Sequence, residues 1–356
     1  MGIGYATVRW NRQKRRYDRI MVALMALYLG LFVVLHLVFQ PEISPETLII
    51  RATATLALLL LHIILLIGPL SRLDARFLPL LYNRRHLGVT MFLVAAVHGV
   101  FSIIQFHASG NVNPMYSLFT SNMQYGSLAH FPFQVLGFFA LLILFLMAAT
   151  SHDFWLKNLG PKGWKSLHMM VYIAYFLIVM HVMLGAYQEE SSPALAALLG
   201  IGMVAVITLH LMAGLREVKK DQEVNVILED GYVEVCDMDE IENNRAKIVT
   251  AHGERIAIFK YDGKLSAVSN VCRHQNGPLG EGKIVDGCIT CPWHGYQYLP
   301  HNGMAPPPFT EKVETYDLRL EGTKIWVNPR PHPPGTTITP LSVSTESGEQ
   351  ISPAVP

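Results

Sequence analysis

The chain is poor in charge, and what it has is balanced between the two signs. Only 15% of its 356 residues are Asp, Glu, Lys or Arg, whereas an ordinary soluble domain has about 25%. The formal net charge is +1, so composition gives no argument for nucleic-acid binding. The hydrophobic share is 51%. These values disfavour a disordered or purely soluble protein and favour one with membrane spans.

Cysteine is also scarce. The four cysteines, Cys236, Cys272, Cys288 and Cys291, all lie in the last third of the chain. Four thiols in a chain of this length do not make a disulfide scaffold. They are more typical of metal ligands with some left over.

Long uncharged apolar stretches are abundant. Each has about the 20 residues that a helix needs to cross a bilayer core. No Asp, Glu, Lys or Arg lies inside them, which counts against a transporter with paired charges at mid-membrane. We expect six transmembrane helices within residues 20–215, at Ile20–Phe39, Ala52–Ser71, Gly88–Phe106, Phe131–Thr150, Met169–Tyr187 and Pro193–Leu215.

Lys and Arg are concentrated in alternate connecting segments. The N-terminal segment 1–19 is rich in Arg, and basic residues follow the second, fourth and sixth stretches. The segments Gln40–Thr47, His107–His130 and Gln188–Ser192 contain none. The positive-inside rule therefore predicts a multi-pass protein of the cell (inner) membrane with both termini in the cytoplasm.

The composition changes after Leu215. We expect a linker at 216–230, and then a small antiparallel β domain at 231–328, because short apolar runs alternate with turn signals there. Examples are Ile256–Phe259 before Asp262-Gly263, then Leu265–Val268, and later Ile325–Val327. The Pro-, Ser- and Thr-rich tail 329–356 is expected to be disordered.

Two short motifs dominate the β domain: Cys272-Arg273-His274 and Cys291-Pro292-Trp293-His294, with sixteen residues between His274 and Cys291. One Cys and one His from each of two loops can hold a [2Fe–2S] cluster, with both thiolates on one iron and both imidazoles on the other. The rival interpretation is a mononuclear zinc site with two Cys and two His.

The region 231–328 resembles the Rieske family in these motifs and in Pro278-Leu279-Gly280-Glu281-Gly282. High-potential Rieske proteins carry one further Cys in each loop, joined as a disulfide, where this chain has Gly277 and Trp293. The resemblance therefore implies the ferredoxin type, with a lower potential. Cys236 and Cys288 are then expected to be buried packing residues. Nothing after Asn328 could supply a mononuclear iron site, so we expect the cluster to relay electrons without transforming a substrate.

Histidines inside membrane spans are costly and indicate function. His98 and His181 lie at the same depth, roughly 20 Å from the inner edge, so their imidazoles can hold a haem iron between facing helices. His36 and His62 are expected to hydrogen-bond neighbouring helices, and His210 to reach toward the cytoplasmic interface.

Residues 20–215 are similar to the ferric-reductase-like transmembrane family. The resemblance rests on Arg84-Arg85-His86-Leu87-Gly88 with His98, and on Trp164-Lys165-Ser166-Leu167-His168 with His181. The haem-binding membrane subunit of methionine-sulfoxide reductase systems is similar. The resemblance implies one or two haem b groups, the second held by His86 and His168 at the inner side. NADPH oxidases follow such a bundle with a flavin domain, whereas this chain has Rieske motifs in that place.

The sequence thus predicts a membrane all-α six-helix bundle followed by a small all-β Rieske domain. Its expected function is electron transfer between a cytoplasmic [2Fe–2S] cluster and haem in the lipid bilayer. The donor would be a cytoplasmic reductase or ferredoxin, and the acceptor would lie on the outer side or be a periplasmic redox partner. The alternative is a redox or iron sensor that uses the cluster as a switch.

Overall fold

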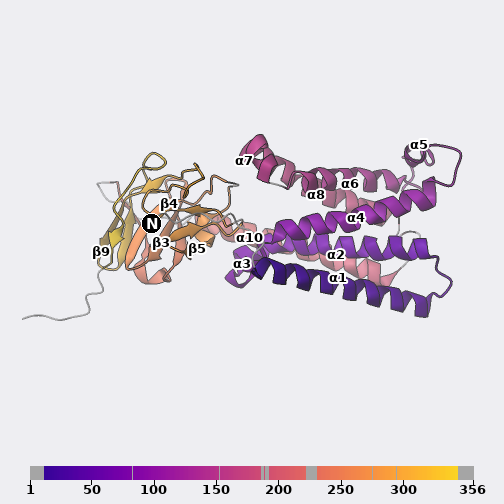
Figure 1. Cartoon of the computed structure of the whole chain (residues 1–356), viewed down its shortest axis with the longest axis horizontal. Helices are drawn as coiled ribbons and strands as arrows, with labels where there is room; N and C mark the ends of the chain where they lie inside the picture. Colours follow the sequence, from indigo (N-terminus) through magenta and orange to yellow (C-terminus); the bar gives the residue numbers. More distant parts are fainter. Residues whose placement is uncertain are drawn as a thin grey trace, which may run out of the picture. The chain divides into compact units, whose positions relative to one another are not determined.

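The computed structural model describes residues 12–81, 83–151, 153–185, 188, 192–221, 231–274, 276–293 and 295–343. The chain divides into two compact units, Trp10–Gly214 and a second that includes everything from Leu215 onward. The first, the membrane unit, is helical, and the second, the β unit, is built from strands that follow the end of helix α10 (Figure 1).

The membrane unit has long helices joined by short connections. Ser44 caps one of them, since its Oγ accepts from the Thr47 amide and Pro45 follows at the first helical position. The helices are α1 (Arg12–Phe39), α2 (Pro45–Leu73), α3 (Leu78–Leu81), α4 (Arg84–His107), α5 (Pro114–Thr120), α6 (Phe133–Ala149), α7 (Asp153–Met169), α8 (Val171–Leu184) and α10 (Pro193–Asp221), with a 3-10 turn at Ala75–Phe77.

Among the described residues, five helical segments are long and apolar enough to cross a membrane. They are Arg15–Phe39, Pro45–Leu73, Arg84–His107, Gly163–Leu184 and Pro193–Val218. The fourth predicted span, Phe131–Thr150, forms as α6, which is apolar but has 17 residues, fewer than the about 20 that a bilayer core requires. The protein is therefore a multi-pass membrane protein.

The fifth span differs from its predicted position. We expected Met169–Tyr187, whereas the helical segment runs over Gly163–Leu184, with a break at Met170 between α7 and α8. Hydropathy locates only the apolar part of a helix, and the backbone continues through the polar residues before it. His168 is therefore the sixth residue of this helical segment.

The predicted linker at 216–230 is partly helical. Helix α10 continues to Asp221, because the residues after Leu215 are good helix formers. Residues 222–230 lie outside the described residues. The basic segment expected at 1–19 likewise becomes helical from Arg12, where α1 begins.

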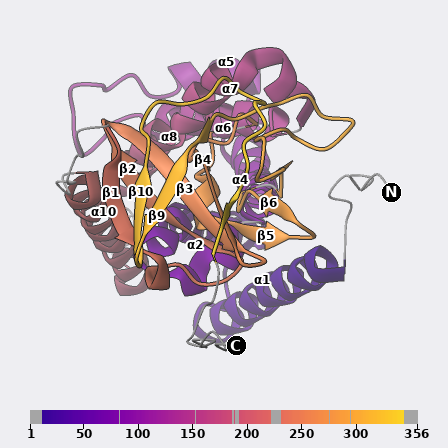
Figure 2. The ribbon, with the colours of Figure 1, turned by 90° about the vertical axis from the view of Figure 1, so that its left-hand side faces the viewer.

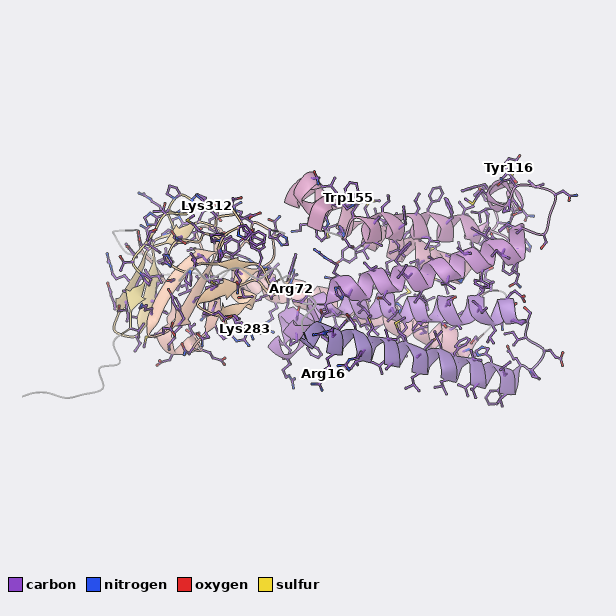
Figure 3. The ribbon with its side chains drawn as sticks, viewed as in Figure 1. Arg16, Arg72, Tyr116, Trp155, Lys283 and Lys312 are labelled. Carbon is purple, nitrogen blue, oxygen red and sulfur yellow. The ribbon has the colours of Figure 1, made fainter. Side chains whose placement is uncertain are left out.

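Helix α2 is the most buried of the long spans, and it packs mainly against α4. Helix α4 also contacts α6, and α6 packs along α8. Helix α1 lies against α2 at the edge of the bundle (Figure 2). Most of its apolar side chains are exposed, as expected for a face that contacts lipid. Arg16 and Arg72 lie at one end of the bundle and Tyr116 at the other (Figure 3).

The β unit contains three antiparallel sheets, ordered β1-β10-β9, β11-β4-β3-β2 with β8 also paired to β4, and β5-β6-β7. The strands are β1 (Val233–Asp237), β2 (Arg245–Ala251), β3 (Glu254–Tyr261), β4 (Lys264–Ser269), β5 (Lys283–Val285), β6 (Cys288–Thr290), β7 (Gln297–Tyr298), β8 (Thr315–Tyr316), β9 (Leu318–Glu321), β10 (Lys324–Val327) and β11 (Leu341–Ser342).

Strand β3 is buried on both faces. Ile256 and Ile258 belong to a core shared with β1 and β10, while Ala257 and Phe259 face a second core that contains Cys272 and Cys291. Successive side chains of a strand point to opposite faces, so one strand serves both cores. The second core supports the cysteine loops.

The predicted strands around the turn signals are confirmed. Asp262 and Gly263, between β3 and β4, both have positive φ, 45° and 66°. This is the two-residue hairpin turn whose twist matches the flanking strands. The hairpin carries the chain directly from β4 into the first cysteine loop.

The expectation of disorder from Pro329 is wrong for residues 329–343. Strand β11 pairs with β4, Leu341 opposite Leu265. Upstream, the His332 amide donates to the Thr315 carbonyl (2.9 Å), and its Nε2 lies 2.8 Å from Oδ2 of Asp317. The composition of a segment reports only how hydrophobic it is. Here the segment is held by backbone hydrogen bonds to the open edge of a sheet, which composition does not reveal. Residues 344–356 lie outside the described residues.

Candidate metal centres

The two cysteine loops have the same backbone hydrogen bonds. The Cys272 amide donates to the Gly277 carbonyl (2.9 Å), and the Asn276 amide donates to the Cys272 carbonyl (2.7 Å). The second loop repeats this pattern, from Cys291 to Tyr296 (2.8 Å) and from Gly295 to Cys291 (2.9 Å). Two unrelated sequences thus form matching loops, each with its cysteine at the same position.

The loops face each other in close contact at Gly277. A Cβ on this glycine would lie 2.9 Å from Sγ of Cys291 and 3.1 Å from the ring of Trp293. The two positions where high-potential Rieske proteins carry a disulfide are therefore neighbours here, filled by a glycine and an indole. Among the described residues no cysteine forms a disulfide.

Both candidate thiolate ligands are buried, each with 1% of its surface exposed. His274 is partly exposed, has a buried Nδ1, and stacks on Tyr296 with ring centroids 4.7 Å apart. The fourth predicted ligand, His294, lies outside the described residues. The described part of the site therefore has two buried thiols on facing loops, and an imidazole that stacks on Tyr296.

Tyr298 is a site residue that the sequence analysis missed. It is fully buried, its hydroxyl lies 3.5 Å from Sγ of Cys272, and the same oxygen accepts from the Arg273 amide (3.0 Å). Burial, followed by the neighbouring Cys272, raises the pKa of Tyr298 well above its usual range. The hydroxyl therefore stays protonated and can donate to a thiolate. Its position in a strand just after the second motif was the available signal.

Within the described residues, no three His, Cys, Asp or Glu side chains are gathered closely enough to hold a single metal ion. A [2Fe–2S] cluster does not need such a group, because each iron takes only two protein ligands. The donor set of thiolates and imidazole, and the bare Gly277 facing Cys291, both fit a cluster between the loops.

The two remaining cysteines are buried packing residues, as predicted. Cys236 lies in the core between the first two sheets, and Cys288 is 1% exposed. Burial raises the pKa of Cys236 to about 11 and also raises that of Cys288. Both side chains therefore stay protonated near neutral pH.

In the membrane unit, the fold brings His98 of α4 and His181 of α8 together. Their ring centroids lie 6.3 Å apart. Nδ1 of His98 donates to the Ile50 carbonyl of α2 (3.1 Å), and Nδ1 of His181 donates to the Phe133 carbonyl of α6 (2.8 Å). A proton fixed on Nδ1 leaves Nε2 as the nitrogen with a lone pair, which is how metal-binding histidines are commonly oriented.

Small residues make room for these imidazoles. A Cβ on Gly137 of α6 would lie 2.8 Å from the His181 ring. Gly137 is four positions after Phe133, so its missing side chain also leaves the Phe133 carbonyl accessible. A metal about 2.0 Å from each of two imidazole nitrogens would separate the ring centroids by roughly 6 Å. The spacing of His98 and His181 fits an iron between them.

His86 and His168, the second predicted pair, have different surroundings. Nδ1 of His86 lies 3.2 Å from Oδ1 of Asp18 in α1. Nδ1 of His168 donates to the Trp164 carbonyl (3.0 Å), one turn back on its own helix, and its Nε2 is buried with no hydrogen-bond partner in the described part of the chain. No ring contact between the two is recorded for the described residues. This pair stays a prediction.

Comparison with known families divides the chain in the same way. Residues 52–179 match the family described as ferric reductase like transmembrane component, and residues 231–317 match the Rieske [2Fe-2S] domain. Both predicted resemblances are confirmed. The matches support an oxidoreductase role in electron transport and a [2Fe–2S] cluster in the β unit.

Individual relatives match parts of the chain. The cholesterol 7-desaturase nvd 1 of Ciona intestinalis is 31% identical over 113 residues, which are 31% of this chain and 23% of that protein. The biphenyl dioxygenase ferredoxin subunit of Pseudomonas sp. (strain KKS102) is 29% identical over 99 residues, 27% of this chain and 91% of that subunit. The solved ferredoxin of carbazole 1,9a-dioxygenase from Nocardioides aromaticivorans IC177 is 24% identical, covering 28% of this chain and 98% of that one, with a TM-score of 0.27.

Proposed function

Because the chain joins a ferric-reductase-like transmembrane domain to a Rieske domain, we propose that it carries electrons across a membrane, between a [2Fe–2S] cluster in the β unit and haem b in the bundle. Both cofactors are one-electron carriers when bound. The similarity of the β unit to a ferredoxin subunit over nearly all of that subunit's length supports a carrier role.

The observation that carries this proposal is the His98–His181 pair. Two imidazoles from different helices lie 6.3 Å apart, and each is oriented by a carbonyl of a further helix. By contrast, His36 and His210 each bond to a carbonyl one turn back on their own helix. We propose that His98 and His181 are the axial ligands of a haem.

For the cluster, we propose Cys272 and Cys291 as ligands of one iron and His274 and His294 as ligands of the other. The matching loops and the buried thiols support this set. Tyr298 would hold the hydrogen bond to the Cys272 sulfur, and the remaining buried aromatic side chains would exclude water from the cluster.

A second haem, held by His168 and His86 near the basic end of the bundle, would shorten the electron path toward that side. The buried Nε2 of His168, which has no partner in the described part of the chain, supports this assignment. Asp18 would orient His86 as a carboxylate commonly orients a ligating histidine. Haem number is decided by measuring haem per polypeptide in wild type and in His86→Ala.

We propose that the basic end of the bundle faces the cytoplasm, as the distribution of Lys and Arg implies. A cytoplasmic reductase or ferredoxin would then reduce the cluster. Electrons would leave on the outer side, to an acceptor there or to a periplasmic redox partner.

The test is electron transfer through the full chain in sealed liposomes. The cluster and haem spectra are followed anaerobically after reduction, while a membrane-impermeant oxidant such as ferricyanide is added outside. We expect oxidation of the cluster by the outer oxidant in wild type, and none in His181→Leu, which keeps the cluster but lacks the haem ligand. A reduced wild-type protein that ignores every outer oxidant would contradict the proposal and favour a sensor.

A further inference from the structure

His62 lies where three helices of the membrane unit meet. It belongs to α2, is 3% exposed, and its Nε2 lies 3.1 Å from the hydroxyl of Tyr175 in α8. The two rings meet edge to face, with centroids 5.5 Å apart. On a third side, a Cβ on Gly202 of α10 would lie 2.4 Å from the imidazole. The absence of a side chain at Gly202 therefore makes the space that this ring fills.

The other ring nitrogen of His62 is unusual for such a tight contact. Nδ1 is buried and has no hydrogen-bond partner in the described part of the chain. Burying a polar atom without a partner is unfavourable, and an apolar ring would fill the same space without that cost. A role in packing helices together does not explain why Nδ1 is buried without a partner. An ionisable group inside a membrane span instead indicates a function.

Other histidines of the spans differ in this respect. Nδ1 of His36 donates to the Phe32 carbonyl, and Nδ1 of His210 donates to the Val206 carbonyl, each one turn back on its own helix. Within the described spans, the buried ring nitrogens without a partner are those of His62 and His168, and His168 is already proposed as a haem ligand. His62 is therefore the remaining place for an added proton.

The groups that could compensate a charge on His62 are few. Its own stretch Ala52–Ser71 contains no Asp, Glu, Lys or Arg. The neighbouring helices contribute Tyr175 at the ring itself on α8, His210 eight positions beyond Gly202 on α10, His98 at Ile50 and Arg84 beside Gly68 on α4, and His36 on α1. The carboxylates of α1, α2 and α10 lie toward the helix ends, at Asp18, Glu46, Glu217 and Asp221. No hydrogen bond joins His62 to a carboxylate in the described part of the chain, and an electron in the bundle would offset its charge.

We propose that His62 takes up a proton at Nδ1 when the bundle takes up an electron. This inference rests on the proposed function, because the electron arrives from the cluster. The proposal takes the tautomer with the proton on Nε2, whose N–H donates to the Tyr175 oxygen and leaves a lone pair on Nδ1. One electron enters the bundle and one proton from the solvent binds that lone pair, so an N–H bond forms as an O–H bond of a hydronium ion breaks. The two added charges have opposite sign in a medium of low dielectric constant, where an uncompensated charge is costly.

The consequence is a reduction potential that depends on pH. Rising pH removes the proton that accompanies the electron, so the midpoint potential of the bundle falls as pH rises. Tyr175 stabilises the protonated ring by accepting from Nε2, so its hydroxyl sets the pH range in which the potential changes.

The test is a spectroelectrochemical titration of the haem in the full chain, reconstituted in nanodiscs, between pH 6 and pH 9. We expect the wild-type potential to fall with pH and the potential of His62→Gln to be independent of pH, because the amide still donates to Tyr175 but does not titrate. Tyr175→Phe should keep the slope and move it to lower pH. His210→Gln is the matched control and should keep the wild-type slope.

The results of these titrations distinguish a failure of this inference from a failure of the proposed function. A wild-type slope retained in His62→Gln, or a flat wild-type potential in a protein that binds haem and is reduced through the cluster, overturns the inference and leaves the proposed function intact. If the wild-type protein binds no haem, the proposed function itself fails. Should His62→Gln lose haem, the shift in Tyr175→Phe decides, and an unshifted profile there refutes the role of His62.

Discussion

Removing one hydroxyl next to the cluster should separate its effect on the reduction potential from its effect on stability. In Tyr298→Phe the ring still fills the buried core, but the hydrogen bond to Sγ of Cys272, at 3.5 Å, is lost. A hydrogen bond to a charged group contributes about 1.5–3 kcal/mol. It is stronger in the reduced cluster, which carries more negative charge on sulfur. Its loss therefore destabilises the reduced state more than the oxidised state.

The magnitude follows from that difference. If the bond strengthens by about 1 kcal/mol on reduction, within the range for a charge-assisted bond, the potential falls by about 40 mV, because a tenfold change in a one-electron equilibrium is about 59 mV. The Arg273 amide also loses its acceptor, at 3.0 Å, which costs about 1 kcal/mol of unfolding free energy. Tyr298→Phe should thus lower both quantities.

The matched control is Tyr261→Phe. Tyr261 is buried in the same core and its hydroxyl is bonded to Oγ of Ser266 at 2.9 Å, away from any cysteine. This variant should lose a similar amount of stability and leave the potential unchanged. The measurements are a redox titration followed by circular dichroism and a thermal melt, both on the purified full chain. A Tyr298→Phe potential at or above wild type, or an equal fall in Tyr261→Phe, would refute the reasoning.

Three further predictions concern other parts of the molecule. Gly137→Ala places a methyl group 2.8 Å from the His181 ring, whereas Gly200→Ala meets nothing within 4 Å. The haem content should therefore fall several-fold in Gly137→Ala and stay at the wild-type level in Gly200→Ala. Equal haem contents in the two variants would show that the His181 ring shifts freely. Deleting 329–356 uncovers the edge of β4 and should lower the melting temperature of the β unit by several degrees relative to a chain that keeps β11. Burial raises the pKa of Cys236 from 9.0 to about 11, so the stability that comes from keeping this thiol protonated is present below pH 9 and is lost as the pH rises toward 11. Iodoacetamide at pH 8 should label Cys236 only in the unfolded protein. Labelling of the native protein would contradict this expectation.

The candidate ligands of the cluster could be named from the sequence because their motifs are local. Cys272 and His274 are two positions apart, Cys291 and His294 three, and such spacings survive any arrangement of the rest of the chain. The approximate positions of the spans were predictable for the same reason, because a membrane-spanning helix needs about 20 consecutive apolar residues. Hydropathy missed helix ends, for example at α1, α2 and α10, where the backbone stays helical through polar residues.

Backbone hydrogen bonding explains the errors in the tail and the site residues that were missed. Nothing in the composition of 329–343 signals order, because its partner is the open edge of β4, more than sixty residues earlier. Tyr298 belongs to the site because the fold places its hydroxyl beside Sγ of Cys272, and no sequence motif links the two residues. Sequence patterns report the preferences of a segment, and these contacts depend on which distant segment the fold places beside it.

The sequence by itself determined that the chain has apolar spans, a β domain, two cysteine–histidine motifs and histidines at matched depth, because each is a property of residues close together along the chain. Only the tertiary structure decided that His98 and His181, 83 positions apart in the sequence, have ring centroids 6.3 Å apart. It also decided that the carbonyls of Ile50 and Phe133 orient these rings. The same holds for His62, which is buried with one ring nitrogen that has no hydrogen-bond partner in the described part of the chain. These features depend on the packing of five helices: α2, α4, α6, α8 and α10. The rotation of each helix about its axis selects the partners of each ring. Packing fixes that rotation, which a uniformly apolar sequence does not reveal.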